Sequence, residues 1–216
     1  ATGAFSFTDL TEGTYHYAVS KYRYDTSSVP TPQQFSIIFR TDTFVVDGPV
    51  TKDIALNFVT LSGKTTDGNG VPVSGVQISS RGYWGTSSTE DHYDIQNNQY
   101  PAITSDSSGN YSLVVWPYAN YSMTLTPPAG SGVVQTSISG MSILADMVQN
   151  LVLNPAHSIS GVVRSSDGTP MSNITVSLQG GPTSGSFKTD ATGAFSFTDL
   201  TEGTYHYEVS KYRYDT

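Results

Sequence analysis

The opening segment of the chain, residues 1–26, returns almost unchanged at its end. Residues 1–26 and 191–216 differ at a single position, where Glu208 stands in place of Ala18. Because the same sequence is expected to build the same structural element, the fold must contain one of its pieces twice, once near each end of the chain. We therefore expect a 190-residue period, with the two copies lying in consecutive repeats of one domain.

Short runs along the chain alternate apolar with polar residues, which is typical of half-buried β-strands. Turn sequences rich in Gly, Asn and Asp separate these runs, as at residues 67–70, 108–110 and 166–168. No segment keeps a helical apolar period for three turns. The chain is thus predicted to be all-β, and frequent turns between short strands favour a β-sandwich. The alternating apolar positions include Tyr121, Met123, Leu125, Ile174, Val176, Leu178, Phe195, Phe197, Tyr205, Tyr207 and Val209.

A fainter repeat lies within the 190-residue period. Residues 160–178 align without gaps on residues 62–80, which lie 98 positions earlier. Residues 193–209 align on residues 109–125 at a separation of 84. Two related domains of similar pattern therefore alternate along the chain.

This alignment gives the expected domain boundaries. Residues 59–156 form a complete sandwich domain, residues 1–58 the C-terminal part of a domain of the other type, and residues 157–216 the N-terminal part of its next copy. Two assemblies satisfy this division. Either the copies follow one another in a continuous covalent array, or separate chains complete each other.

The motifs resemble a known family. The sequence SGVVRSSDGTPMSNITVSL, followed by TDATGAFSFTDLTEGTYHYEVS, is similar to carboxypeptidase regulatory-like domains and to the related collagen-adhesin B-type repeats. The resemblance implies a seven-strand Greek-key sandwich of transthyretin-like or immunoglobulin-like type. It also implies a stalk or spacer without catalysis.

Charge and composition exclude several functions. With 10 Lys and Arg against 18 Asp and Glu, the net charge is −8, which is unsuited to a nucleic-acid phosphate backbone. No apolar run has the length of a membrane span, so no membrane insertion is expected in this segment. The chain has no cysteine, which excludes disulfides, thiol catalysis and cysteine-ligated metals. The Ser-, Thr- and Tyr-rich composition favours an extracellular or cell-surface β protein.

An aromatic segment at residues 81–98 is the most distinctive part of the sequence. It lengthens the domain at 59–156 between its second and third strands relative to the other domain, as the difference between the offsets 98 and 84 shows. We expect a loop here, which is either a platform for a carbohydrate or protein ligand, or a cover that packs on the sandwich end or on an adjacent domain. The candidate contact residues are Tyr83, Trp84, His92, Tyr93, Tyr100, Trp116 and Tyr118.

No catalytic, cofactor or metal-binding motif is recognisable, so the chain is not expected to be an enzyme. Aspartates at Asp67, Asp106, Asp167 and Asp190 leave open calcium binding at the domain junctions. Each also stands in a Gly-containing turn, where an aspartate caps the backbone in any case. Asparagine sequons at Asn110, Asn120 and Asn173 are possible glycosylation sites.

These observations favour a structural, extracellular tandem-repeat protein that forms a semi-rigid filament, fibre or adhesin stalk, with neighbouring copies of itself as partners. One alternative is an adhesive module that binds glycans or host cell-surface ligands through the 81–98 segment. Another is a set of accessory domains of a secreted enzyme.

Overall fold

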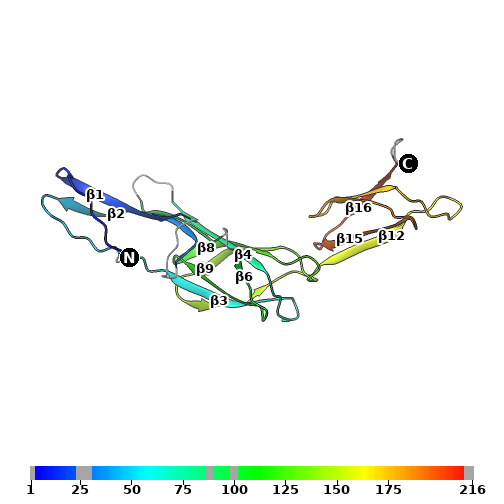
Figure 1. Ribbon diagram of the computed structural model, residues 1–216, viewed down its shortest axis with the longest axis horizontal. Coiled ribbons are helices and arrows are strands. Elements are labelled where there is room, and N and C mark those ends of the chain that lie inside the picture. Colours follow the sequence, from blue (N-terminus) through cyan, green and yellow to red (C-terminus); the bar gives the residue numbers. More distant parts are fainter. Residues whose placement is uncertain (1–2, 23–30, 86–89, 98–101, 212–216) are drawn as a thin grey trace.

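The computed structural model describes residues 3–22, 31–85, 90–97 and 102–211 (Figure 1). All regular secondary structure in these residues is β-strand, which confirms the predicted all-β class. The strands are β1 (Gly13–Lys21), β2 (Gln34–Val46), β3 (Val59–Thr66), β4 (Gln77–Trp84), β5 (His92–Asn97), β6 (Ile103–Thr104), β7 (Asn110–Val115), β8 (Tyr118–Thr126), β9 (Thr136–Ile143), β10 (Met147–Val148), β11 (Leu151–Val152), β12 (His157–Val162), β13 (Thr175–Gln179), β14 (Gly185–Lys188), β15 (Ala194–Leu200) and β16 (His206–Ser210). In the part of the chain that the structure describes, no helix has the length and apolar character needed to cross a membrane.

A β-sandwich occupies the middle of the chain. One sheet runs in the order β5-β4-β8-β9, with β6 also paired to β4, and the other contains β7, β3, β10 and β11. Strands β10 and β11 both run parallel to β3 and form an interrupted edge strand. The inward-facing residues of both sheets make one core, because alternate positions of each strand point to the same face. Its largest fully buried side chains include Leu61, Ile78, Tyr121, Met123, Leu125, Ile143, Leu151 and Leu153.

A second, smaller set of strands follows at residues 157–210 and lies at the far end of the molecule from β1 and β2 (Figure 1). Here β12 pairs with β15, and β13 pairs with both β14 and β16. Val176 and Leu178 from β13 pack against Phe197 and Leu200 from β15 in a separate core. The same layered arrangement is therefore present with fewer strands.

Backbone hydrogen bonds repeat in the two sets of strands at the separations found in the sequence. The Thr65 N–H donates to the Gly109 carbonyl at 2.9 Å, and the Val163 N–H donates to the Gly193 carbonyl at the same distance. The two donors are counterparts at the offset 98, and the two acceptors at the offset 84. The internal alignment thus corresponds to shared local structure, while the domain boundaries drawn from it stay a prediction.

Two buried hydroxyls show the same relation. The Ser105 hydroxyl accepts a hydrogen bond from the Val76 N–H at 3.0 Å and donates to the Val73 carbonyl at 3.1 Å. Thr189, the counterpart of Ser105 in the later set of strands, makes the same two bonds with Ile174 and Met171. Each hydroxyl fixes the turn that precedes a core strand.

Strands β1 and β2 extend the larger sheet of the central sandwich. β1 and β2 form an antiparallel pair, and β2 pairs on its other side with β5, from Gln34↔Gln96 to Ile38↔His92. The sheet therefore continues as β1-β2-β5-β4-β8-β9 across a segment predicted to hold a domain boundary (Figure 1).

We expect Ser105→Ala to lower the free energy of unfolding by about 1–3 kcal/mol, because the buried Val76 N–H loses the hydroxyl that accepts its hydrogen bond. Urea denaturation monitored by tyrosine and tryptophan fluorescence measures this change. Exposed Ser107 is the matched control, and Ser107→Ala should alter stability by less than about 0.5 kcal/mol. Equal effects of the two substitutions would contradict the role given to Ser105.

Candidate functional site

The aromatic segment at residues 81–98 is a β-hairpin extension in its described parts, so the predicted loop is wrong for residues 81–84 and 92–97. β5 pairs with β4 from Ser80↔Asn97 to Trp84↔Tyr93. The prediction of a loop follows from the extra length of the segment in the internal alignment, and the segment is also rich in polar and charged residues. Those residues occupy one face of a strand whose other face, at Ile95, is fully buried.

Trp116 is at the centre of an aromatic cluster between the central sandwich and the β1–β2 segment. Its ring lies 6.3 Å from Phe39, 5.8 Å from Phe58 and 6.4 Å from Tyr93, measured between ring centroids. Buried Phe35 adds to the cluster through Phe58, with centroids 5.1 Å apart. Edge-to-face and tilted pairs of this kind stabilise packing beyond the area that they bury. The cluster therefore joins residues of β2, β5 and the connection between β2 and β3.

Two more predicted contact residues extend this cluster along the sheet. Trp84 stacks on Tyr93 with centroids 6.1 Å apart, and Tyr93 meets Tyr118 edge-on at 5.2 Å. Burial raises the pKa of the Tyr93 hydroxyl, so this side chain stays neutral at physiological pH. Trp84, Tyr93, Trp116 and Tyr118 are thus brought together. Tyr93 and Trp116 pack against buried Phe35, Ile37 and Ile95, Tyr118 packs against the sandwich core, and Trp84 stays partly exposed.

Asp91 fastens the tip of the extension to β2. Its carboxylate accepts hydrogen bonds from the N–H groups of Arg40 and Thr41 at 2.7 and 2.8 Å, and from the Thr41 hydroxyl at 2.8 Å. Partial burial by itself would raise the pKa of Asp91, but the bonds from Thr41 and Arg40 outweigh it and lower the pKa. The charged carboxylate is therefore the form that holds this end of the junction.

Asn97 fastens the other end. Its side-chain oxygen accepts a hydrogen bond from the Gln33 N–H at 2.9 Å, and its amide nitrogen donates to the Ser80 hydroxyl at 3.2 Å and the Val114 carbonyl at 3.0 Å. Asn97 is buried, so these partners replace water. One side chain thereby connects the start of β2 with β4 and β7.

Tyr83 lies on the opposite, solvent-facing side of the extension. It is 47% exposed, and the Arg81 guanidinium lies 5.6 Å from its ring centroid. Arg81 also pairs with Asp94 at 3.0 Å, and the bond to Asp94 raises the pKa of the arginine. This face presents one exposed aromatic ring beside an ion pair.

The remaining predicted contact residues lie elsewhere. His92 begins β5 and is half-buried, and its buried ring Nδ1 has no hydrogen-bond partner in the described part of the chain. Tyr100 lies outside the described residues. Sequence reasoning missed Phe35, Ile37 and Phe39, although the alternation in QFSIIF is a strand signal. The junction roles of Asp91 and Asn97 had no sequence signal, because both depend on partners far away in the chain.

The four turn aspartates bond to the backbone, as one of the two alternatives expected. Asp67 Oδ1 accepts the N–H groups of Asn69 and Val71, and Asp106 and Asp190 make matching bonds. The Ser165 hydroxyl and the Thr169 N–H lower the pKa of Asp167 to about 2. Within the described ranges, no three His, Asp or Glu side chains are grouped as metal ligands would be. Calcium binding at the junctions remains an untested prediction.

The sequon asparagines occupy different surroundings. Asn110 and Asn120 are exposed, and the Asn110 amide donates to Asp106 at 2.9 Å. Asn173 is half-buried with a positive φ of 57°. Glycosylation at these positions stays a prediction.

Comparison with known proteins gives a family match for the C-terminal strands. Residues 158–216 match the family model of the carboxypeptidase regulatory-like domain. The predicted resemblance is confirmed for this carboxypeptidase regulatory-like segment, which contains β12 to β16. The central sandwich makes the same backbone hydrogen bonds as this segment, at the positions 98 and 84 residues earlier. Comparison with the curated proteins gave no match.

Three solved structures show a distant likeness. The streptococcal ancillary pilin is 13% identical with a TM-score of 0.43, over 94% of this chain and 67% of that one. GBS52, the minor pilin of Streptococcus agalactiae, is 12% identical with a TM-score of 0.38, over 72% and 84%. Chlorocatechol 1,2-dioxygenase from Pseudomonas putida is 13% identical with a TM-score of 0.29, over 51% and 68%. At these scores no functional inference rests on the likeness.

We expect Asp91→Ala to lower the free energy of unfolding by about 1–2 kcal/mol at pH 7, because three hydrogen bonds to a carboxylate are lost. The folded-state pKa of Asp91 lies below its unfolded value of about 3.9. Its contribution is therefore complete above that value and disappears as the pH falls through the folded pKa. Urea denaturation of both proteins at pH 7 and pH 2 measures the difference.

The matched control is exposed Asp53, and Asp53→Ala should change stability by less than about 0.5 kcal/mol at either pH. A difference between Asp91→Ala and the parent chain that persisted unchanged at pH 2 would rule out the carboxylate as its source.

Proposed function

We propose that the chain is a non-catalytic structural segment of an extracellular or cell-surface repeat protein, in which successive sandwiches are held as a semi-rigid rod. The pairing of β2 with β5 carries this proposal. A strand from one predicted domain thereby becomes part of the sheet of the next. Backbone hydrogen bonds across a boundary restrict bending more strongly than a flexible linker would.

The side chains at the boundary support the same role. Phe35 and Ile37 on β2 and Ile95 on β5 are buried together, at 6%, 2% and 0% exposure. Leu56 and Phe58, in the short connection to β3, pack against them. Apolar packing of this density between successive units resembles the nearest-neighbour interfaces of other repeat proteins.

A binding role is the second candidate, and the exposure of Tyr83 and Trp84, at 47% and 39%, favours it. Exposed rings beside the Arg81–Asp94 pair have the amphipathic character that sugar and protein ligands contact. Of these two rings, Trp84 stacks on Tyr93 in the aromatic cluster, and Tyr83 lies on the opposite, solvent-facing side of the extension. Substitution of Tyr83 therefore separates the two candidates from one another.

The distance between two spin labels tests whether the junction between the β1–β2 segment and the central sandwich is rigid. The chain has no cysteine, so labels go on exposed Thr14→Cys in β1 and Ser122→Cys in β8. We expect a narrow distance distribution by double electron–electron resonance, and Trp116→Ala should broaden it because the ring bridging Phe39, Phe58 and Tyr93 is lost. A broad distribution in the labelled chain with Trp116 intact would contradict a rigid junction.

Tyr83→Ala is the matched control for the aromatic cluster. Because Tyr83 faces solvent, its loss should leave the label distances unchanged and stability within about 0.5 kcal/mol. Binding to a glycan array that is abolished by Tyr83→Ala, with unchanged label distances, would support the adhesive alternative.

A further inference from the structure

The repeated sequence of residues 1–26 and 191–216 occupies two different environments. In the first copy, β1 pairs with β2. In the second copy, β16 pairs with β13. Their counterpart in the central sandwich, β8, has partners on both sides, β4 and β9. Each copy of the repeated strand therefore pairs along one of its two edges, β1 with β2 and β16 with β13.

The registers show which strand each edge accepts. Leu125 of β8, the counterpart of Val209 and Val19, pairs with Thr136 of β9, while Val19 pairs with Ile37 of β2. Two positions earlier, Met123 pairs with Ile138 and Tyr17 with Phe39. β2 is therefore the counterpart of β9, and the edge of β16 that has no partner strand among the described residues matches a strand of the β2 type.

β12 has an unused edge of the same kind. Its counterpart β3 lies between β7 and the interrupted strand β10–β11, whereas β12 pairs with β15 on one side within the described residues. Residues 48–54 follow β2 as β10 and β11 follow β9. β2 is thus the counterpart of the strand that β16 lacks within the described residues. Residues 48–54 form no strand there, but they hold the chain position of the strand that β12 lacks.

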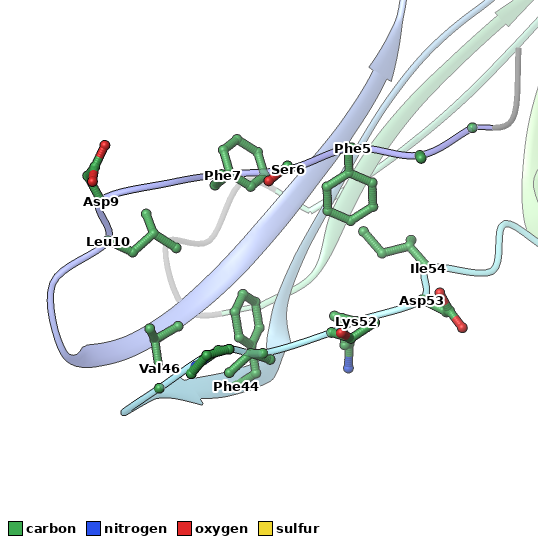
Figure 2. A pocket seen from close by; sticks show the side chains of 16 residues that line it. Phe5, Ser6, Phe7, Asp9, Leu10, Phe44, Val46, Lys52, Asp53 and Ile54 are labelled. Atoms are coloured by element: carbon green, nitrogen blue, oxygen red, sulfur yellow. The ribbon is translucent and has the colours of Figure 1, made fainter.

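The first copy of the repeated sequence lines a groove, which is a second observation on the same strands. It has a volume of about 840 Å³ and lies between residues 3–10 and residues 44–54. Figure 2 shows Phe5, Phe7 and Leu10 along one wall, opposite Phe44 and Ile54. The side chains of Phe5, Phe7 and Leu10 are 57%, 75% and 44% exposed.

The same side chains are covered in the second copy. Phe197 and Leu200 correspond to Phe7 and Leu10, and they are 8% and 3% exposed. β12 pairs with this strand, with Ile159 opposite Phe197. In the second copy these side chains are covered by Val176 and Leu178 of β13 together with Ile159 of β12, whereas the same sequence in the first copy lines an open groove.

The one substitution between the copies favours β16 over β1 as the partner of β2. Ala18 faces Ile38, and Arg40 lies two positions further along the same face of β2. Among the residues that the structure describes, the buried Arg40 Nε has no hydrogen-bond partner, and the Arg40 Nη1 lies 3.4 Å from His16 Nε2. With β16 in the same register, Glu208 replaces Ala18 beside Arg40 and supplies a carboxylate.

We propose that residues 157–211 of one copy replace residues 3–21 alongside β2 of a second copy of this chain, forming one composite sandwich. The proposal rests on the structural role given above and names the partner. The exchange releases residues 3–21. Residues 3–10 are already exposed, and β16 replaces the contacts of β1 with β2, since the two strand sequences differ only at Glu208. The two docking parts lie at opposite ends of the molecule, so the contact does not close and chains add head to tail (Figure 1).

Cysteine crosslinking tests this register in the full chain. Ser20 pairs with Ser36 in β1–β2, so Ser210 of one copy should face Ser36 of another. We mix a Ser36→Cys variant with a Ser210→Cys variant and oxidise mildly after incubation long enough for β1 to leave. The expected product is a covalent heterodimer, and a chain carrying both cysteines should give a ladder of oligomers.

The matched control pairs Ser36→Cys with Lys211→Cys, whose expected position is opposite Phe35, so that the two side chains point to opposite faces of the sheet and cannot form a disulfide. At least tenfold less heterodimer is expected there. Equal yields in the two mixtures, or monomers by light scattering at high concentration, would overturn the exchange. If the distances between labels on residues 14 and 122 stay narrow in that case, the proposed rod stands and the partner is wrong.

The Glu208→Ala variant tests the preference between copies. It makes residues 191–216 identical to residues 1–26. We expect about two- to fivefold weaker self-association by analytical ultracentrifugation, the range for an exposed ion pair. Unchanged association of Glu208→Ala would remove Glu208–Arg40 pairing from the proposal.

Discussion

The antiparallel pairing of β2 with β5 is the interaction on which the arrangement of this molecule depends. Each strand alone would present an unpaired edge, with open N–H and C=O groups that favour aggregation. Together they close both edges and bring Phe35, Ile37 and Ile95 into one buried cluster. The hydrogen bonds of Asp91 and Asn97 then fix the two ends of the pair.

The additional residues of the central sandwich, which form β5, make this contact with β2. β6 pairs with β4 at Gln77↔Thr104, in the position where β14 pairs with β13 at Thr175↔Lys188. The shared strand is therefore retained in both, and β5 is an addition. The added hairpin builds a new sheet edge that β2 occupies, so a difference between two related units becomes the contact between them.

Local structure was predictable from the sequence, and long-range pairing was not. Alternation and Gly-Asn-Asp turns indicated the strands, and the internal alignment at offsets 98 and 84 indicated equivalent hydrogen bonds. The partner of β5 depends on matching edges and side chains from residues 34–46, far away in the chain. The sequence leaves open whether Tyr93 and Trp116 contact a ligand or pack on the sandwich or an adjacent domain, because aromatic side chains do both. The structure shows that Trp116 packs on Phe39 and Phe58 and that Tyr93 packs on Trp116, so the two rings join two segments.

Hydrogen–deuterium exchange along the β2–β5 ladder tests the continuity of this sheet most directly. We expect the amides of residues 34–38 and 92–96 to be protected to a degree similar to those of β4 and β8, since all belong to one sheet. Rapid exchange at residues 34–38 and 92–96, with β4 and β8 still protected, would contradict a sheet shared across the predicted boundary.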